Sequence, residues 1–334
     1  MSPPFVLAVD GGNSKTDLAL VGVDGSLLAL RRGGRSSPHG VGVKGSVEVV
    51  DALFEQARAH AGLDGASSPR AEVAQLLMAG LDSLHEEEEF FAAVEARGWA
   101  RSTRVGNDTF AVLRAGTERG WGVAVVCGAG INCVGVSPDG RHARFPALGT
   151  ISGDWGGGYD VGLAALHAAA RSEDGRGPRT SLENSVPAHF GLAAPHEVAE
   201  AIHRRRLDAR RLEELPPLVY AEADRDEVAA TIVERLAGEV VALARVALER
   251  LELDREPTEV LLGGGLLQAA NGRLLSSIEN GVREVAPAAV VRQAGSPPIV
   301  GAGLLALDEV RAGVEAQQRF RQELAAAVKG GGDG

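Results

Sequence analysis

The chain has few cysteines, few aromatic residues and no excess of positive charge. Of its 334 residues only Cys127 and Cys133 are cysteine, and aromatic residues make up 4%. So few cysteines, close together, favour reduced core residues of a cytoplasmic protein. A net charge of -11 and an isoelectric point of about 5.3 argue against nucleic acid or an anionic membrane surface as the main partner.

Long hydrophobic runs are also missing. No stretch approaches the roughly 20 apolar residues that span a bilayer. The apolar run Phe5 to Val9 has no basic segment before it and is too short for a signal peptide. We therefore expect a soluble protein that stays in the cytoplasm. Its length permits two domains, each with its own core.

Glycine, in contrast, is abundant, and a glycine-turn hairpin occurs twice. The first copy runs from Val6 to Gly25 and the second from Val123 to Gly140. Each copy has an apolar strand, a glycine-rich turn, a second apolar strand and an Asp-Gly turn. Glycine turns let backbone N–H groups approach an anion closely, so two such turns facing each other would hold a polyphosphate. The repeat predicts a nucleotide-dependent phosphoryl-transfer site.

The segments after the first hairpin alternate between helix and strand patterns. Apolar residues recur at helical spacing over 47–57, a loop precedes them at 36–40, and an apolar run of strand length covers 73–79. A helix follows over 86–97, its four leading acids being a solvated face near the N-terminus. A short strand near 104–105 then enters a helix directly, which puts Asp108 at the junction. This order predicts an α/β domain with a mixed sheet.

A second domain opens near Gly120 with the second hairpin. Its landmarks are a glycine-rich segment from Ser152 into a helix over 162–171, the longest helical pattern over 226–251, and a strand that runs into Gly263. We expect a first domain over residues 1–118, completed by a C-terminal helix over 313–328, and a second domain over 119–312. Residues 329–334 are predicted to be a disordered tail.

Five segments, in order along most of the chain, resemble the N-acetylglucosamine kinase branch of the BadF/BadG/BcrA/BcrD ATPases, within the actin-like sugar kinase and Hsp70 ATPase superfamily. They are Asp10–Thr16, Asn107–Asp108, Gly128–Asn132, Gly153–Gly157 and Leu262–Leu266. Each alone is a weak signal, but five in register are specific. The resemblance implies an α/β fold of two ribonuclease-H-like, actin-like ATPase domains with a cleft between them, closing on ATP and substrate.

The resemblance also implies which residues bind ATP and Mg²⁺. The phosphate and adenosine contacts fall on Gly11, Gly12, Asn13, Lys15 and Thr16, on Gly128, Ala129 and Gly130, and on Gly263, Gly264 and Gly265. Asp10 ends a buried strand, where a carboxylate is costly unless a hydrated Mg²⁺ satisfies it, or unless it caps the turn. Lys15 is alternatively a solvated lysine, and Thr16 a residue that simply favours the strand.

Asp108 is the candidate general base, which would accept the proton of a sugar hydroxyl during phosphoryl transfer. Either Asn107 or Asp108 would also serve as the N-cap of the following helix, and residue physics alone does not separate the two roles. The position that Asp108 takes in the resemblance favours catalysis.

The sugar contacts implied by the resemblance are Ser37, His39, Asn107, Asp108, Asn132, Asp154 and Trp155. Asp154 offers two acceptors to vicinal hydroxyls, although an Asx turn would use it equally well. The chain departs from many relatives in having Ala129 in place of Thr and Trp155 in place of Glu. Trp155 would alternatively supply a stacking face for a pyranose ring, so both departures bear on which sugar is bound.

The sequence thus predicts an ATP- and Mg²⁺-dependent kinase that converts N-acetylglucosamine to its 6-phosphate, acting as a homodimer. Glucosamine and N-acetylmuramic acid are alternative substrates. A dehydratase-activator ATPase is disfavoured because an iron–sulfur cluster needs exposed thiolates, whereas both cysteines lie in or beside the phosphate hairpin. A non-catalytic sugar sensor is the remaining alternative.

Overall fold

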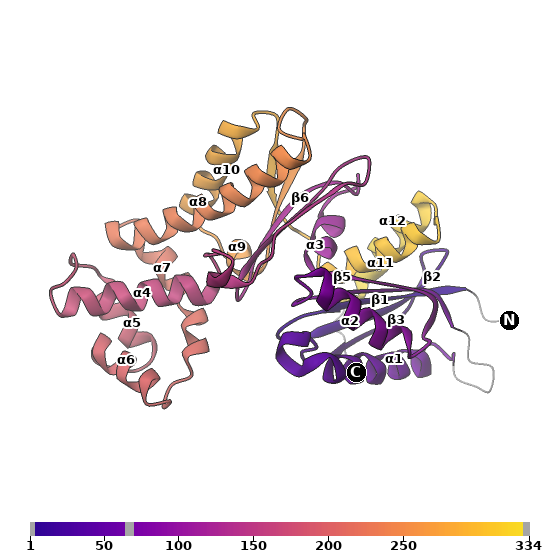
Figure 1. Ribbon diagram of the computed structural model, residues 1–334, viewed down its shortest axis with the longest axis horizontal. Coiled ribbons are helices and arrows are strands. Elements are labelled where there is room, and N and C mark those ends of the chain that lie inside the picture. Colours follow the sequence, from indigo (N-terminus) through magenta and orange to yellow (C-terminus); the bar gives the residue numbers. More distant parts are fainter. Residues whose placement is uncertain (1–3, 64–69, 330–334) are drawn as a thin grey trace. The chain divides into compact units, whose positions relative to one another are not determined.

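The computed structural model describes residues 4–63 and 70–329, which form two compact units (Figure 1). Unit 1 combines Met1–Gly120 with Ala294–Gly334, and unit 2 is Trp121–Gln293. Each unit is built around one five-stranded mixed sheet. The predicted fold class, two α/β domains with mixed sheets, matches this architecture.

The sheet of unit 1 has the order β3-β2-β1-β4-β5. Its strands are β1 (Phe5–Gly11), β2 (Thr16–Gly22), β3 (Leu27–Gly33), β4 (Ala71–Met78) and β5 (Ala100–Asn107). The first three strands are antiparallel neighbours, and β1, β4 and β5 are parallel. Parallel strands end at the same edge, so the ends of β1, β4 and β5 bring their last residues together.

Helices cover both faces of this sheet, which explains why β1 is an unbroken apolar run. Leu7 and Val9 face a core with α1 (Pro38–His60) and α2 (Leu84–Glu95). Val6 and Ala8 face the opposite core, which contains residues of α3 (Thr109–Gly116), α11 (Pro298–Glu309) and α12 (Val314–Lys329).

The second unit is shorter at its C-terminal end than the sequence suggested. The expected second domain ended at residue 312, whereas the structural division falls between Gln293 and Ala294. The reason is α11, whose apolar side packs on α3 and β1 of unit 1. A Cβ on Gly301 would lie 1.9 Å from the Ala111 carbonyl oxygen, so only glycine permits this approach. Of the expected tail 329–334, Lys329 ends α12 and the rest lies outside the described residues.

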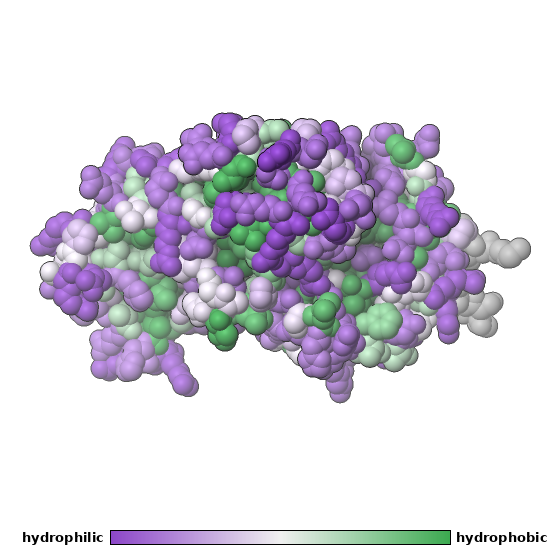
Figure 2. Space-filling model, turned by 45° about the horizontal axis from the view of Figure 1, so that its top comes forward, coloured by the Kyte–Doolittle hydropathy of each residue, from purple (hydrophilic) through white to green (hydrophobic). Residues whose placement is uncertain are grey.

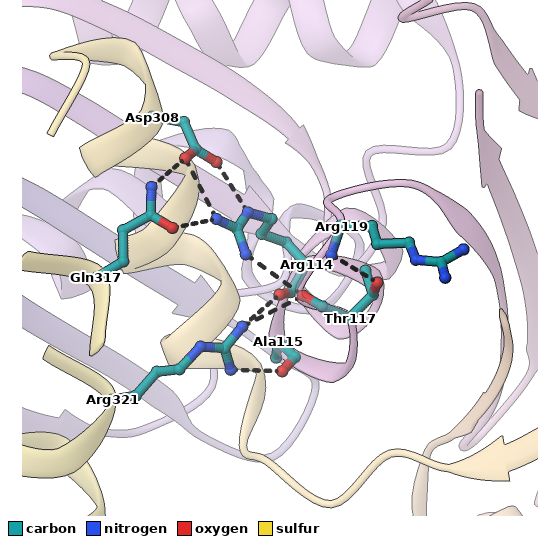
Figure 3. Close-up of polar contacts among 7 residues, drawn as sticks. All are labelled: Arg114, Ala115, Thr117, Arg119, Asp308, Gln317 and Arg321. Carbon is teal, nitrogen blue, oxygen red and sulfur yellow. Dashed lines mark hydrogen bonds and ion pairs between the residues drawn. The ribbon is translucent and has the colours of Figure 1, made fainter. Parts of the chain in front are cut away.

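Two arginines tie the C-terminal helices to α3 (Figure 3). The buried Arg114 donates to both carboxylate oxygens of Asp308, at 2.8 and 3.2 Å, and to Gln317. Arg321 of α12 donates to the carbonyl oxygens of Arg114, Ala115 and Thr117. These are the carbonyls that a helix leaves unsatisfied at its C-terminal end, so Arg321 caps α3 from the far end of the chain.

The sheet of unit 2 has the order β10-β9-β6-β7-β8. Its strands are β6 (Gly122–Cys127), β7 (Ile131–Val136), β8 (His142–Arg144), β9 (Glu259–Gly263) and β10 (Val290–Gln293). Its helical segments are η1 (Gly149–Ile151), α4 (Gly158–Glu173), α5 (Leu182–His189), α6 (Pro195–His203), η2 (Ala209–Glu214), α7 (Pro216–Glu222), α8 (Glu227–Arg250), α9 (Gly265–Gln268) and α10 (Gly272–Val285). One large core joins the sheet to α4, α8 and α10. Both cysteines are free and buried in it, as predicted.

Hydrophilic residues predominate on the face drawn in Figure 2, with hydrophobic residues in smaller areas between them. Within residues 4–63 and 70–329, no helix is long and apolar enough to cross a membrane.

Candidate functional site

Three residues at one edge of the unit 1 sheet come from three different strands. In the strand register, Gly11 pairs with Met78, and Met78 pairs with Asn107. Asp10 and Asp108 are 98 residues apart in the sequence. They therefore lie at the same edge of the sheet, where the parallel strands have their carboxyl ends. This edge is where α/β folds place their ligands.

Among the residues that the structure describes, none forms an ion pair with Asp10, although Lys15 and Arg32 lower its pKa from a distance. Burial, and then the negative charges of Asp108 and Asp17, raise its pKa to about 7. The nearby cations Lys15 and Arg32 are both engaged by Asp17, at 2.5 and 2.6 Å. A carboxyl group in such surroundings is stabilised by a cation placed beside it.

The donor set around Asp10 fits a hydrated Mg²⁺. Among the described residues no group of three or more His, Cys, Asp or Glu side chains is arranged to hold a metal. Mg²⁺ does not need such a cage, because it keeps several waters and takes one or two carboxylates together with substrate phosphates. Asp10 is the residue of this edge that would contact it.

The sequence left open whether Asn107 or Asp108 caps the following helix, and the structure shows different hydrogen bonds for the two side chains. The Asn107 side-chain oxygen accepts from the Thr109 N–H at 3.0 Å and from the Thr109 hydroxyl at 2.7 Å, so Asn107 holds the start of α3. Its amide nitrogen donates to Asp82 at 2.8 Å and to the Leu81 carbonyl. Asp108 makes no side-chain capping bond. Its carboxylate interacts with the N–H groups of Asp108 and Thr109 and keeps further acceptor capacity.

The pKa of Asp108 is raised to about 6. Burial is the largest cause, and the negative charge of Asp82 is the second, while the N–H groups of Asp108 and Thr109 oppose the rise. At neutral pH the group is thus mostly ionised yet more basic than an ordinary aspartate. Those are the properties of a general base.

The loop at Ser36 and Ser37 is fixed from inside the protein. The buried Thr16 hydroxyl lies 2.7 Å from the Gly34 carbonyl oxygen and 2.6 Å from the Ser36 hydroxyl. The N–H groups of Ser36 and Ser37 donate to the Gly12 carbonyl. Thr16 therefore positions the loop, and this engagement favours the structural interpretation of Thr16 over a phosphate contact.

Ser37 and His39 lie beside the edge. Ser37 is 1% exposed, and no residue that the structure describes forms a hydrogen bond with its hydroxyl, so a ligand or a water molecule would satisfy it. A Cβ on Gly80 would meet both Ser37 and His39 within 3.1 Å. His39 pairs with Glu86 at 2.7 Å. The predicted loop at 36–40 is shorter than expected, because Pro38 already begins α1, where a missing N–H is tolerated.

In unit 2, three glycine segments that are far apart in sequence meet at the end of β6. A Cβ on Gly157 would lie 2.0 Å from the Ala129 carbonyl oxygen, and a Cβ on Gly264 would lie 2.2 Å from that of Cys127. The Gly158 N–H donates to the Gly128 carbonyl at 2.8 Å. Positions 128 and 130 themselves face open space. The three segments thus pack closely against one another around the 128–130 turn.

The polar residues predicted near this turn have partners in the structure. The Asn132 side-chain oxygen accepts from the Cys133 N–H at 2.7 Å. Asp154 accepts from the Ser152 hydroxyl. The Arg235 guanidinium lies 4.0 Å from the centre of the Trp155 ring. One face of the indole is therefore covered by a cation, which leaves at most the other face for the predicted stacking on a sugar.

The sequence pattern of the BadF/BadG/BcrA/BcrD ATPase family matches residues 7–306. The chain belongs to this ATPase family. The five motif segments all lie inside the matched region, so the resemblance drawn from them is confirmed.

Relatives of this BadF/BadG/BcrA/BcrD ATPase family member are named sugar kinases. The N-acetylmuramic acid/N-acetylglucosamine kinase of Clostridium acetobutylicum is 28% identical over 269 residues, covering 80% of this chain and 87% of the relative. The N-acetyl-D-glucosamine kinase of Dictyostelium discoideum is 26% identical over 318 residues, covering 92% and 99%.

Solved structures confirm the fold class. A Chromobacterium violaceum protein proposed to be an N-acetylglucosamine kinase superposes with a TM-score of 0.71 at 25% identity, covering 91% of this chain and 99% of that chain. The ROK hexokinase of Thermus thermophilus superposes with a TM-score of 0.54 at 19% identity, covering 92% and 100%, and shows the fold alone.

The buried cysteines bear on the iron–sulfur alternative. Burial raises the pKa of the Cys127 and Cys133 thiols far above the usual range, so both are neutral thiols. A cluster ligand has to be a thiolate with access to iron. The structure therefore gives no support to a dehydratase-activator role for these two residues.

Several residues that hold the site in place were passed over in the sequence. Glu86 was counted among solvated acids, yet it forms a capping box with Ser83 and pairs with His39. Hydrogen bonds from His39 and Ser83 lower the pKa of Glu86 to about 2, despite its partial burial. The Ser83 to Glu86 spacing was a signal for this box. Asp17 and Asp82 gave no such signal, because only strand pairing and a loop bring them to Asp10 and Asp108.

Proposed function

We propose that the chain phosphorylates an amino sugar, converting N-acetylglucosamine and ATP to N-acetylglucosamine 6-phosphate and ADP. The coarser assignment, an ATP-dependent sugar kinase, follows from the family and from the named activities of its relatives. Both of the relatives described above act, by their names, on N-acetylglucosamine, which supports this sugar as substrate.

The observation that carries the proposal is the state of Asp108. Its side chain forms no capping hydrogen bond to α3, and its pKa is raised to about 6. It lies at the same edge of the sheet as Asp10. A purely structural aspartate at a helix start would use its oxygens on the first N–H groups. Here the Asn107 side-chain oxygen accepts from the Thr109 N–H at 3.0 Å, and Asp108, which also interacts with that N–H, keeps acceptor capacity for a substrate hydroxyl.

In the proposed step, Asp108 accepts the proton of the sugar 6-hydroxyl. The hydroxyl oxygen forms a bond to the γ-phosphorus as the bond from that phosphorus to the bridging oxygen of ADP breaks. The raised pKa makes the carboxylate a stronger base than an ordinary aspartate, while most of it stays ionised above pH 6. Asn107 keeps the carboxylate at a fixed place by anchoring the start of α3.

The glycine turns are the proposed nucleotide contacts. In unit 1 these are Gly11, Gly12 and Asn13, with Lys15 as a nearby cation, and in unit 2 they are 128–130 and 263–265. A Cβ placed on Gly128 or Gly130 would meet nothing within 4 Å, so phosphate oxygens have room to approach this turn, whose Gly128 N–H already donates to the Gly130 carbonyl at 2.9 Å. Mg²⁺, held at Asp10, would neutralise charge on the phosphates during transfer.

The proposed sugar contacts are Ser37 and His39 in unit 1 and Asn132, Asp154 and Trp155 in unit 2. The Asn107 amide already uses both of its donors and both of its acceptor positions within unit 1, which gives it a positioning role instead. The unpartnered buried hydroxyl of Ser37 is the strongest of the sugar contacts, because a ligand hydroxyl would satisfy it. Asp154 keeps acceptor capacity beyond its bond from Ser152, so it can accept from a sugar hydroxyl.

The test is sugar-dependent release of ADP from Mg-ATP. The panel contains N-acetylglucosamine, glucosamine, N-acetylmuramic acid, N-acetylmannosamine, glucose and a blank without sugar. We expect turnover with N-acetylglucosamine, and a fall in kcat of about 10²- to 10⁴-fold in Asp108→Asn, the range for loss of a general base. Glu95→Gln, an exposed acid of α2, is the matched control and should keep full activity.

Two results would contradict the proposal. Equal ADP release with and without sugar would point to an ATPase or to a sensor that binds without turnover. Unchanged turnover in Asp108→Asn would remove the assigned base while leaving the kinase activity in place.

A further inference from the structure

The side chain of Glu86 joins the loop after β4 to the start of α1. Its Oε2 atom accepts from the Asp82 N–H at 3.0 Å, from the Ser83 N–H at 2.8 Å and from the Ser83 hydroxyl at 2.9 Å. Its Oε1 atom lies 2.7 Å from Nε2 of His39. The two carboxylate oxygens therefore have different partners: one fixes the loop in front of α2, and the other holds the imidazole ring.

This contact determines which nitrogen of the neutral imidazole carries the hydrogen. Partial burial disfavours ionisation of Glu86, but the hydrogen bonds from His39, Ser83 and the Asp82 N–H outweigh it and lower the pKa to about 2. An ionised carboxylate can only accept, so the hydrogen in the contact has to come from Nε2. A neutral imidazole has a single N–H group, which leaves Nδ1 of His39 as an acceptor.

This acceptor lies beside the buried hydroxyl of Ser37. A Cβ on Gly80 would lie 3.1 Å from Nδ1 of His39 and 2.9 Å from Oγ of Ser37, so both atoms approach the same point next to Gly80. Within the described parts of the chain, neither atom forms a hydrogen bond with a protein group. An acceptor and a hydroxyl group are thus close together at the sheet edge that also holds Asp108.

His39 needs a partner to keep this orientation. Its side chain is 50% exposed, and an imidazole in water exchanges between its two tautomers and several rotamers. Glu86 is itself fixed, because it is the N3 residue of the capping box that begins α2 at Ser83. The three hydrogen bonds on Oε2 therefore keep Oε1 in a constant position beside Nε2.

We infer that Glu86 is a positioning residue, which fixes the tautomer of His39 so that Nδ1 accepts a hydrogen bond from a donor group of the substrate. The inference rests on the proposed function, in which Ser37 and His39 contact the sugar. A sugar hydroxyl and the N–H of an acetamido group are both suitable donors. A substrate group that can only accept would leave Nδ1 unpaired, so the contact discriminates against it.

Glu86→Gln separates this role from the capping of α2. Glutamine also serves at the N3 position of a capping box, so its single side-chain oxygen can keep the bonds from Asp82 and Ser83. Its NH₂ group then faces His39, and because this group donates, Nε2 has to accept. The imidazole hydrogen consequently moves to Nδ1, which turns an acceptor into a donor. Glu89→Gln, an exposed glutamate of the same helix, is the matched control.

The first readout is the tautomer itself. The ¹⁵N chemical shifts of an imidazole distinguish a nitrogen that carries hydrogen from one that does not, and His39→Ala identifies the signals of His39 among those of the 8 histidines. Spectra recorded from about pH 6 to about pH 9 include the neutral ring. We expect Nδ1 of that ring to be without hydrogen in the wild type and in Glu89→Gln, and to carry it in Glu86→Gln.

The second readout is the division of the effect between KM and kcat. Glu86→Gln should raise the KM for N-acetylglucosamine by about five- to tenfold, because a hydrogen bond is replaced by two donors that face each other. The kcat and the KM for ATP should stay within about twofold of the wild type, since Asp108 and the glycine turns are unchanged. His39→Ala should raise the sugar KM by a similar factor, and adding Glu86→Gln to it should have no further effect.

Three results would overturn the role of Glu86 while leaving the kinase assignment intact. These are hydrogen on Nδ1 of the neutral ring in the wild type, the same tautomer in the wild type and Glu86→Gln, and KM effects of Glu86→Gln and His39→Ala that multiply in the double variant. If the wild type turns over no sugar, the proposed function and the substrate contact both fail, and the ¹⁵N spectra still decide whether Glu86 sets the tautomer.

Discussion

The two glycine-turn hairpins have the same outline but opposite chemistry. The β1–β2 turn joins a pair formed by Asp10 and Asp17, with Lys15 and Arg32 close by. The β6–β7 turn is three residues long, carries no charged side chain, and is closed in by the backbone at Gly157 and Gly264. The first hairpin therefore brings charged side chains together, whereas the second is defined by close packing of its backbone. A repeated motif in sequence does not imply a repeated task.

The largest effect is expected from disrupting the close backbone packing around the second hairpin. Gly264→Ala should lower the free energy of unfolding by about 2–4 kcal/mol, because the new Cβ would lie 2.2 Å from the Cys127 carbonyl oxygen and the residue has a φ of +83°. Gly265→Ala, whose Cβ would face open space, is the neighbouring control. Chemical denaturation measures both, and equal stability of the two variants would contradict the close packing.

The next largest effect is expected from removing the carboxylate charge of Asp10 in the first hairpin. Asp10→Asn should lower kcat by about 10²-fold, as loss of a group that stabilises transferring phosphate does. It should also raise stability at pH 8 by about 1–2 kcal/mol.

The sign of that stability change follows from the raised pKa. The folded-state pKa of Asp10 is about 7, above its ordinary value of 3.8. Its contribution to stability is therefore full below about pH 4 and is lost as the pH rises through 7. Thermal melts at pH 5 and pH 8 measure the effect, and the gain from Asp10→Asn should shrink at the lower pH. A variant less stable at pH 8 would show that the carboxylate is well satisfied without a cation.

A pH profile sharpens the comparison within unit 1. Asp108 must be ionised to accept a proton, so kcat/KM should fall about tenfold per pH unit below 6. Asp82→Asn should move this limb to lower pH, because Asp82 is the second cause of the raised pKa. Burial, the first cause, remains, so the limb should stay above the ordinary aspartate range. A limb that does not move would mean that another group controls the profile.

The smallest effect concerns the cap that α12 supplies to α3. Arg321→Ala should lower stability by about 1–2 kcal/mol, because the Arg114 and Ala115 carbonyl oxygens lose the bonds from Arg321 and the Thr117 carbonyl keeps only its bond from Arg114 at 3.4 Å. Arg319→Ala, which removes exposed ion pairs to Asp24 and Glu323, is the control and should have a smaller effect. Equal losses in denaturation experiments would show that α3 does not depend on α12 for its end.

Sequence patterns predicted the hairpins, the alternating helices and strands, and the order of the glycine segments. These features are local, since apolar period and glycine turns act over a few residues. The assignment of α11 was wrong for a physical reason: its apolar run needs a partner, and sequence alone did not say that α3 and β1 supply it. The small helices between 182 and 222 were missed because their patterns are short.

The candidate site divides in the same way. By itself the sequence determined that Asp10, Asp108 and three glycine segments exist at strand ends, and what kind of chemistry they suit. Only the tertiary structure decided which side chains remain free for that chemistry. Asn107 anchors the start of α3 next to Asp108, and Asp17 pairs with the two cations that lie near Asp10. Charge and hydrogen-bond balance depend on every neighbour in space, and the fold alone brings those neighbours together.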